Sequence, residues 1–553
     1  MNAFVHVEEL SLRYEMHKKN VLSSVNFTLN SGESVLLLGP SGSGKSTLTF
    51  CLNGIFPREL DGEMEGQVSI NGIENRNIKL GERSKQVGVV FQDPETQFCM
   101  LTVEDEVAFG LENIGIPPQE MEERIDYALE LVQMKDLKTA DIATLSGGQK
   151  QKLALACILA LEPELLILDE PTANLDPLAT KDFIATIKKL KNKLDFGLIV
   201  IEHKLDGWTD IAERAILLNR QGEIFYDGPI RDVIRVKRTQ LLEEGIWVPR
   251  VTQHVMRENP HIENPPLTVE EYRQNPLPVV KRISEPPVPA ENNAMPLLEA
   301  ENISWSVGNH DILHNISLTF HRGEFVAIAG PNGSGKTSLS RLLAGLRQPT
   351  KGDIYLHGKP LKQWKESMLR QEVGYVFQNP EHQFITHTVY DEVAFGLRWK
   401  EIAEDQAREK VEEVLKTCGL LDLSHAHPFS LSQGQKRRLS VATMLIDDQS
   451  LLLLDEPTFG QDAHSNQELM NLLSKKHQDG ATLIMITHDM DLIHEYATRV
   501  IVIKDGKVAA DCSPAELWKV EQGCLEKWQL EQPIAVQLSN IYEKEMEYVS
   551  TTT

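Results

Sequence analysis

Two glycine-rich stretches carry the residue types and the spacing needed to hold phosphate groups. They read GPSGSGKS at 39–46 and GPNGSGKT at 330–337, and we call them the glycine loops. In such a loop the backbone N–H groups converge on phosphate oxygens, and the following helix adds a favourable dipole. Lys45 and Lys336 are predicted to reach the terminal phosphates, and Ser46 and Thr337 to ligate Mg2+.

The residues predicted to contact the nucleotide extend one position beyond each glycine loop. They are Gly39, Pro40, Ser41, Gly42, Ser43, Gly44, Lys45, Ser46 and Thr47 in the first stretch, and Gly330, Pro331, Asn332, Gly333, Ser334, Gly335, Lys336, Thr337 and Ser338 in the second. A turn used only for packing is the alternative. Each stretch stands between an apolar run and a helical pattern, which favours the phosphate-binding interpretation.

A pair of acidic residues follows an apolar run in each half of the chain. LLILDEP contains Asp169 and Glu170, and LLLLDEP contains Asp455 and Glu456. Phosphoryl transfer depends mainly on positioning and charge compensation. It needs one carboxylate beside the metal and a second one to polarise the attacking water. We assign the aspartates to Mg2+ and the glutamates to the water, against the alternative of a solvated Asp-Glu turn.

These motifs occur twice, in the same order and at nearly constant separation. Each glycine loop is followed by an LSxGQ segment, by the sequence DEPT and by a lone histidine. The separation is 291 residues for the loop lysines, 286 for the strand-end aspartates and 285 for His203 and His488. Chance matches would not keep this register. The sequence therefore predicts one nucleotide-hydrolysing domain present in two copies.

Buried strands and helices must alternate to place these residues. The apolar runs at 35–38 and 325–329 lead straight into the glycine loops. The segment KQKLALACILALEP, at 150–163, repeats apolar residues at spacings of three and four, and the runs LLILD and GLIVIEH follow it. Helices that alternate with continuous apolar strands indicate a parallel sheet. We therefore expect α/β domains.

Length, charge and cysteine usage restrict the class of protein. The chain has 553 residues, more than one hydrophobic core accommodates, and its formal charge of -25 argues against nucleic acid as a partner. No run approaches the roughly 18 apolar residues of a membrane-spanning helix, and no leader pattern opens the sequence, so we expect a soluble chain. The six cysteines form no CxxC pair, so we expect neither a disulfide nor a metal cluster.

Proline-rich sequence separates the two copies. Between about 249 and 296 the periodic patterns give way to prolines with polar residues between them, which is typical of a linker. Thr268 and Glu271 match a capping box, which predicts one short helix there. The predicted organisation is a first ATPase domain at 1–245, a linker at 246–296, a second ATPase domain at 297–535 and a polar tail that frays at 536–553.

Six motifs in each half resemble those of the ATP-binding cassette (ABC) ATPases. Besides the glycine loops and acidic pairs, they include the LSxGQ segments at 145–149 and 431–435, Gln92 and Gln378 after VGVVF and VGYVF, and the lone histidines. The resemblance implies two P-loop NTPase domains, each with a mostly parallel core sheet, an antiparallel β subdomain and a helical subdomain. It also implies that ATP and Mg2+ are bound, with both glutamines beside the metal.

In this family two cassettes close face to face, and each ATP lies between the glycine loop of one and the LSxGQ segment of the other. By this resemblance, the first site combines Lys45, Gln92, Asp169, Glu170 and His203 with Ser432, Gly434 and Gln435. The second combines Lys336, Gln378, Asp455, Glu456 and His488 with Ser146, Gly148 and Gln149.

Histidine and aromatic residues complete the candidates. His203 and His488 follow apolar runs, where the family has a catalytic histidine that contacts the terminal phosphate; a structural imidazole is the alternative. Tyr14 and Trp305 each stand 25 residues before a glycine loop, where the family stacks an aromatic ring on adenine. Packing of an edge strand is the alternative for these two rings.

One motif departs from the family pattern. The second LSxGQ segment has Gln433 where the first has Gly147. If this position required a positive φ, a side chain would cost roughly 1 to 2 kcal/mol. The flanking Ser432 and Gly434 are retained. We therefore expect two hydrolysing sites, of equal or unequal rate.

The segments after the two glutamines resemble a particular subtype. DPETQF at 93–98 and NPEHQF at 379–384, each followed by DEVAFGL, are similar to the ATPases of energy-coupling factor (ECF) importers, which take up vitamins and transition metals. In those importers this region receives coupling helices of a transmembrane subunit through its arginines. The acidic runs at 104–106 and 391–392 carry the opposite charge; a solvated helix face is the alternative.

The resemblance implies an ATP-hydrolysing importer subunit at the cytoplasmic face of the cell membrane. Its partners would be a transmembrane coupling subunit and a substrate-binding membrane subunit, without nucleic acid. The substrate leaves no mark on this chain: a vitamin, a precursor or a metal such as cobalt stays open, and the fused arrangement favours thiamine or its hydroxymethylpyrimidine precursor. The alternatives are a soluble tandem ATPase on ribosomes, disfavoured by the proline-broken linker, and a sugar-importer ATPase, disfavoured by the PExQF segments.

Overall fold

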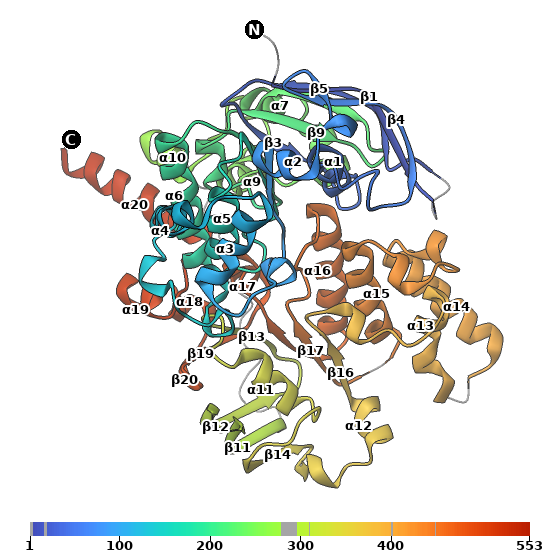
Figure 1. The fold of residues 1–553 in the computed structure, drawn as a ribbon. Coiled ribbons are helices and arrows are strands. Elements are labelled where there is room, and N and C mark those ends of the chain that lie inside the picture. Colours follow the sequence, from blue (N-terminus) through green and yellow to red (C-terminus); the bar gives the residue numbers. More distant parts are fainter. Residues whose placement is uncertain are drawn as a thin grey trace. The chain divides into compact units, whose positions relative to one another are not determined.

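The computed structural model describes residues 4–15, 19–277, 296–308, 310–399, 402–447 and 449–552. The chain divides into two compact units, of which one comprises Met1–Asn275 and Asp462–His464 and the other Pro276–Gln461 and Ser465–Thr553. Figure 1 shows the elements of both units, coloured along the sequence. Residues 278–295 of the predicted linker lie outside the described residues.

A six-stranded sheet forms the core of the first unit. Its order is β10-β9-β3-β8-β7-β6, and all neighbours are parallel except β9 and β10. The residues of β6, β7 and β8 are all buried, because helices cover a parallel sheet on both faces. The strands are β3 (Ser34–Leu38), β6 (Val87–Val90), β7 (Leu165–Asp169), β8 (Gly197–Ile201), β9 (Arg214–Leu218) and β10 (Ile224–Pro229).

A four-stranded antiparallel sheet, in the order β2-β1-β4-β5, completes the strands of the first unit. Its inward side chains share a hydrophobic core with β3 and helix α1. Alternating buried and exposed residues in β2 fit a sheet that is covered on one face. The strands are β1 (Val5–Tyr14), β2 (Leu22–Leu29), β4 (Gly62–Ile70) and β5 (Ile73–Glu74).

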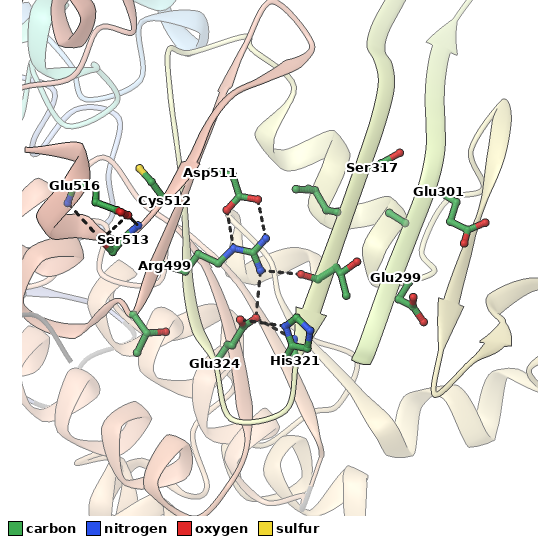
Figure 2. A pocket seen from close by; sticks show the side chains of 14 residues that line it. Glu299, Glu301, Ser317, His321, Glu324, Arg499, Asp511, Cys512, Ser513 and Glu516 are labelled. Carbon is green, nitrogen blue, oxygen red and sulfur yellow. Dashed lines mark hydrogen bonds and ion pairs between the residues drawn. The ribbon is translucent and has the colours of Figure 1, made fainter. Parts of the chain in front are cut away.

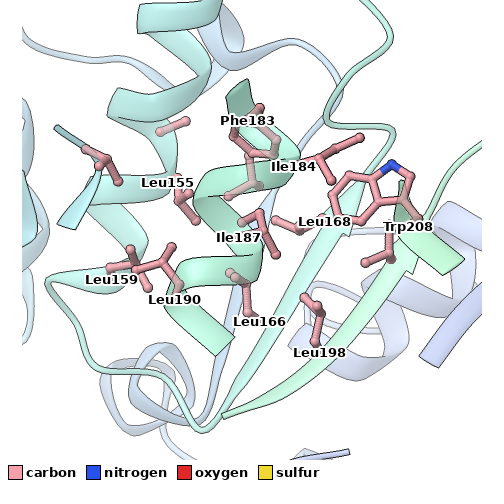
Figure 3. Packing of buried hydrophobic residues seen from close by; sticks show 14 of the residues in the cluster. Leu155, Leu159, Leu166, Leu168, Phe183, Ile184, Ile187, Leu190, Leu198 and Trp208 are labelled. Carbon is pink, nitrogen blue, oxygen red and sulfur yellow. The ribbon is translucent and has the colours of Figure 1, made fainter. Parts of the chain in front are cut away.

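Helices of the first unit pack against the core sheet through fully buried apolar side chains. In Figure 3, Leu155 of α5 and Phe183 and Ile187 of α6 lie close to Leu168 of β7 and to Trp208. Truncating a buried ring such as Phe183 to alanine costs about 3 to 5 kcal/mol. The helices are α1 (Lys45–Asn53), α2 (Leu80–Gln86), α3 (Val103–Asn113), α4 (Pro118–Leu131), α5 (Gly147–Leu159), α6 (Pro177–Lys193), α7 (Ile230–Val236) and α8 (Arg238–Glu244).

The second unit repeats this topology. Its core sheet has the order β16-β17-β18-β13-β19-β20, which is the first sheet read from the other edge, and its antiparallel sheet has the order β12-β11-β14-β15. The strands are β11 (Pro296–Val307), β12 (His310–His321), β13 (Phe325–Ala329), β14 (Lys351–Leu356), β15 (Lys359–Pro360), β16 (Val373–Val376), β17 (Leu451–Asp455), β18 (Thr482–Ile486), β19 (Arg499–Lys504) and β20 (Lys507–Cys512). The predicted α/β fold class is confirmed.

Helices α13, α14 and α15 gather in one part of the second unit, where they contact one another and α15 contacts β16 (Figure 1). The helices of this unit are α11 (Lys336–Leu343), α12 (Glu366–Glu372), α13 (Val389–Ala394), α14 (Glu404–Thr417), α15 (Gln433–Leu445), α16 (Ala463–Gln478), α17 (Met490–Tyr496), α18 (Pro514–Leu517), α19 (Gln522–Lys527) and α20 (Ile534–Thr552). Among the helices of the described residues, none combines the length and the apolar character of a membrane span.

The described part of the segment predicted as a linker contains two helices, whereas one short helix was predicted there. Both α9 (Arg250–Glu258) and α10 (Val269–Gln274) belong to the first unit, and Tyr272 is fully buried. Helix α10 starts after Thr268, whose hydroxyl accepts a hydrogen bond from the backbone N–H of Glu271 at 3.2 Å. Most of the predicted polar tail, 536–553, lies in helix α20.

Candidate functional site

Each glycine loop joins the end of a core strand to the first residue of a helix. The first loop follows β3 and leads into α1 at Lys45, and the second follows β13 and leads into α11 at Lys336. Gly44 and Gly335 have φ angles of 92° and 100°, in the left-handed region that favours glycine. A Cβ atom at Gly44 would also lie 2.8 Å from the carbonyl oxygen of Val21. The backbone setting required for a phosphate loop is present in both units.

The loop lysines are buried inside their own loops. Lys45 Nζ donates to the carbonyl oxygens of Gly39 and Pro40 at 2.8 and 2.9 Å, and Lys336 makes the two equivalent bonds at 2.8 Å. Burial lowers the pKa of Lys45, although the nearby acidic pair acts in the opposite direction. A cation enclosed by loop amides can hold a polyphosphate.

Two buried hydroxyl groups test whether the loops fit phosphate. The side chains of Ser43 and Ser334 are 1% and 6% exposed. Within the described residues, neither Oγ atom has a hydrogen-bond partner. An unpaired buried hydroxyl lowers stability, so its presence points to a ligand that accepts its proton. The oxygens of a bound phosphate supply such acceptors.

The strand-end aspartates lie beside the loop hydroxyls. The hydroxyl of Ser46 hydrogen-bonds to Asp169, and Thr337 Oγ1 donates to Asp455 Oδ1 at 3.3 Å. Burial raises the pKa of Asp169 to about 6, and the charge of Glu170 adds to the shift. Burial also raises the pKa of Asp455. Because Mg2+ prefers oxygen ligands, each pair of side chains fits this ion.

The acidic residues that follow the aspartates face the predicted histidines. His203 Nε2 lies 3.1 Å from Glu170 Oε1, and His488 Nε2 lies 3.3 Å from Glu456 Oε1. Burial acts to raise the pKa of Glu170, but His203 and the charge of Lys45 together outweigh it, and the pKa is lowered. Glu170 is therefore ionised near neutral pH, as a group that polarises water must be.

The two predicted glutamines are placed differently. Gln92 Nε2 donates to Glu170 Oε2 at 2.9 Å, so the first unit brings Gln92, Glu170 and His203 together. Gln378, the corresponding residue of the second unit, is exposed. Nothing in the two motif sequences distinguishes these glutamines.

The LSxGQ segments form the starts of helices α5 and α15. Ser146 Oγ accepts the N–H of Gln149 at 3.3 Å, and Gln149 Oε1 accepts the N–H of Ser146 at 2.8 Å. Ser432 and Gln435 form the same capping box at 3.4 and 2.9 Å. These predicted ATP-binding side chains thus fix a helix N-terminus, whose dipole favours an anion.

Gln433 is the first residue of helix α15, and the backbone of an α-helix has a negative φ. Its counterpart Gly147 is the first residue of α5, where a Cβ atom would lie 3.9 Å from its nearest neighbour. A side chain at this position is therefore free of the strain considered above. The next position is tighter, because a Cβ atom at Gly148 would lie 3.2 Å from that of Ala179.

Tyr14 and Trp305 lie on the antiparallel sheets and are partly exposed. The hydroxyl of Tyr14 lies 3.1 Å from Thr47 Oγ1, and its ring meets Phe56 edge to face. Trp305 packs against the hydrophobic core of its unit. Both rings keep an exposed part, and the contact with Thr47 places Tyr14 beside the first glycine loop.

The PExQF segments connect to the LSxGQ helices through ion pairs. Lys150 Nζ lies 2.5 Å from Glu95 Oε1, and Lys436 Nζ lies 2.6 Å from Glu381 Oε1. Each lysine directly follows the glutamine of an LSxGQ segment. In both units, the same ion pair therefore connects the PExQF segment to the LSxGQ helix.

The acidic runs include carboxylates that are turned inward. Glu106 Oε2 accepts the N–H groups of Cys99 and Met100 at 2.9 and 2.7 Å, and Glu392 Oε2 likewise accepts two backbone N–H groups, at 3.0 and 2.8 Å. Both glutamates are buried, so they hold the preceding loop. Asp105 is the exposed residue of the run 104–106, so a partner protein can contact its carboxylate.

A family model described as ABC transporter matches residues 22–173 and 313–459. The two matches cover both glycine loops, both LSxGQ segments and both acidic pairs whose geometry is given above. The chain belongs to the ABC transporter family. Its two units are ATP-binding domains of ATPases that are coupled to transport.

Relatives of this ABC protein match it over most of their length. "Putative HMP/thiamine import ATP-binding protein YkoD" of Bacillus subtilis (strain 168) is 44% identical over 99% of this chain and 98% of that protein. A "Putative ABC transporter ATP-binding protein" of Methanosarcina mazei is 36% identical over 94% and 90%. The solved structure of "cbiO1 from clostridium perfringens: Part of the ABC transporter complex cbiONQ" is 33% identical, covers 44% of this chain and 99% of that chain, and has a TM-score of 0.38.

Two buried residues beside the ABC motifs were missed by the sequence predictions. Glu202 directly precedes His203, and Tyr375 donates from its hydroxyl to Asp455 Oδ2 at 3.4 Å. The corresponding residues of the other copy are Thr487 and Val89. A position-by-position comparison of the two copies contains the signal that would have found them.

A pocket of about 590 Å3 lies elsewhere in the second ABC unit, between β11, β12, β19 and β20 (Figure 2). At its centre, Arg499 forms a paired ion contact with Asp511 at 2.6 and 2.7 Å. Arg214 forms the same contact with Asp227 in the first unit, at 2.6 and 2.7 Å. Each arginine also donates to a carbonyl oxygen of the antiparallel sheet, Arg499 to Thr319 at 2.7 Å and Arg214 to Thr28 at 3.0 Å. The arrangement therefore connects the two sheets of each unit.

Proposed function

We propose that this chain is the ATP-hydrolysing subunit of an ECF-type importer for thiamine or its hydroxymethylpyrimidine (HMP) precursor. The observation that carries the proposal is the 44% identity, over nearly the whole of both chains, to a protein whose name specifies HMP/thiamine import. The PExQF segments of both copies support the ECF subtype. The chain acts at the cytoplasmic face of the membrane, through a transmembrane coupling subunit and a substrate-binding subunit.

The glycine loops hold the phosphates of ATP in this proposal. Lys45 and Lys336 neutralise the terminal phosphates, and the loop amides and buried serine hydroxyls donate to their oxygens. Ser46 with Asp169, and Thr337 with Asp455, would hold Mg2+, and we assign Gln92 and Gln378 to the ion as further ligands. The ion supplies charge compensation for the phosphates during transfer.

Glu170 and Glu456 polarise the water that attacks the terminal phosphate. Each lies within 3.3 Å of a histidine nitrogen and is held in a left-handed backbone conformation, with φ of 48° and 51°. Such a backbone costs energy outside glycine, and it concentrates at functional sites. His203 and His488 orient these carboxylates and, as hydrogen-bond donors, contact the terminal phosphate.

The segments after Gln92 and Gln378 form the proposed docking surface for the coupling subunit. Leu101 is 79% exposed and Ile385 is 66% exposed, and acidic side chains accompany them. An apolar group bordered by exposed carboxylates fits a partner helix that carries apolar side chains and arginines. The contacts from Gln92 to Glu170 and from Glu95 to Lys150 link this surface to the ATP-binding motifs.

Charge reversal on this surface tests the proposal. Glu104→Lys with Asp105→Lys should release a co-purifying membrane protein while ATP binding persists, because both carboxylates lie on helix α3 of the docking surface. Glu122→Lys with Glu123→Lys on α4 changes the net charge equally at exposed positions away from the motif and should retain the partner. Equal retention by both variants, or sedimentation of the chain with ribosomes, would contradict the proposal.

A further inference from the structure

Glu202 is a buried carboxylate that connects two segments of the first ATP site. The residue is 5% exposed and lies just after β8, beside the end of β7. Its Oε1 atom accepts two hydrogen bonds from Thr172, from the N–H at 2.9 Å and from the hydroxyl at 2.5 Å. Its Oε2 atom accepts the N–H of His203 at 3.2 Å. One side chain thereby joins the Asp-Glu-Pro-Thr segment to the histidine.

The second copy positions its histidine by other means. Thr487 stands in place of Glu202, is fully buried and accepts the N–H of Asp489 at 3.1 Å. Asp489 in turn accepts the N–H groups of Asp491 and Leu492 and caps helix α17. A histidine in this fold can therefore be held without a carboxylate at the preceding position.

Folding stability alone would not favour a buried carboxylate at this position. A buried charge is costly unless it is fully compensated, and a threonine serves at the same position of the second copy. Buried ionisable groups in such settings concentrate at functional sites. We propose that Glu202 is a positioning residue that sets the alignment of His203 and Glu170 in the first ATP site, and that its ionised form is the effective one.

The surroundings of Glu202 explain why its charge state matters. Burial raises its pKa to about 7; the two bonds from Thr172 and the charge of His203 act to lower it, and the charge of Glu170 acts to raise it. The charged groups that face it are thus Glu170, at the end of β7, and His203, in its own segment. An ionised carboxylate can accept from Thr172 and His203 at once, whereas protonation weakens one of these acceptors.

Steady-state ATPase measurements on the full chain from pH 6 to 9 test this inference, which rests on the catalytic roles proposed above for Glu170 and His203. Glu202→Gln keeps the shape and one carbonyl acceptor but cannot ionise. Its kcat should fall by about two- to tenfold at pH 8.5 and by little at pH 6, with KM for ATP nearly unchanged. Glu202→Thr, which introduces the residue of the second copy, should behave in the same way.

Thr172→Val supplies a second and independent readout. It leaves the carboxylate in place and removes the hydroxyl that lowers its pKa, so the alkaline rise in activity should move to higher pH. The matched control is Thr458→Val, at the same place in the second copy, where Thr487 replaces the carboxylate; it should leave the profile unmoved.

Three results would overturn the inference: a loss in Glu202→Gln that is the same at every pH, no loss at pH 8.5, or a Thr172→Val profile that does not move. Glu170→Gln in the same assay checks the underlying catalytic role separately. If Glu170→Gln keeps full activity, the proposed site is wrong. If it is inactive while Glu202→Gln matches the unmodified chain at every pH, only the inference about Glu202 is wrong.

Discussion

Glu170 and Glu456 combine a strained backbone with a histidine contact at the end of a buried strand. Replacing both with glutamine keeps their size and should lower ATP turnover by at least about 100-fold, since a general base contributes that much or more. Binding of a fluorescent ATP analogue should persist, because neither residue belongs to a glycine loop. The exposed Glu120, changed to glutamine, is the control. Retained turnover in the double variant would remove both residues from the mechanism.

Glu202 also makes a prediction about stability. Its pKa of about 7 in the folded chain lies above the ordinary value of 4.5, so its contribution to folding is fully present below about pH 4.5 and is lost as the pH rises through 7. Glu202→Gln has no carboxyl group to ionise, so the folded variant does not lose stability from this position as the pH rises. The variant should gain stability relative to the unmodified chain between pH 5 and pH 8, by up to about 3 kcal/mol. Urea unfolding at the two pH values measures the difference, and an equal difference at both would contradict it.

At the scale of elements, the ion pairs from the PExQF segments to helices α5 and α15 define a mechanical link. Glu95→Gln with Glu381→Gln removes both pairs. Both glutamates are partly solvated, so the melting temperature should change little. Stimulation of ATPase activity by the membrane partner should fall about twofold or more, while the activity of the isolated chain is kept. Undiminished stimulation would show that the link does not transmit the partner's signal.

The core elements follow from sequence because their signals are local. Apolar runs that end at a glycine loop or at Asp169 specify buried parallel strands, and the structure has β3 and β7 there. Helix α10 was predicted from the capping box of Thr268 and Glu271, and the structure has a helix there. Helix α9 was not predicted, since prolines interrupt its region and its burial depends on packing against the rest of the unit. A helix of nine residues spans too few turns for its apolar spacing to be distinctive in the sequence.

The site was predictable only where a residue type has one role in a motif. This holds for the lysines and serines of the glycine loops and for the acidic pairs at the strand ends. Glu202 was not recognised, because a glutamate after an apolar run usually faces solvent at a strand end. Its burial and its contacts with Thr172 arise from the neighbouring strand, which the linear sequence does not place.

Across the whole molecule, the two copies share the same backbone arrangement but differ in the contacts of their side chains. The two proposed catalytic glutamates share a left-handed backbone, yet Gln92 contacts Glu170 while Gln378 is exposed. The first copy is therefore better organised for polarising water. Lys45→Ala should lower ATPase activity more than Lys336→Ala, by about twofold or more, in parallel assays of the full chain. Equal losses, or a larger loss in Lys336→Ala, would contradict this ranking.

Import of thiamine or HMP driven by this chain can be measured as ATP-dependent transport across a vesicle membrane. The chain is purified with its co-purifying membrane proteins and reconstituted with the ATPase units facing outward, and labelled thiamine, HMP and cobalt are presented in the lumen. We expect ATP-dependent movement of thiamine or HMP from the lumen to the ATPase side, and we expect Glu170→Gln with Glu456→Gln to abolish it. Movement of cobalt alone, or no ATP-dependent movement by a complex that hydrolyses ATP, would contradict it.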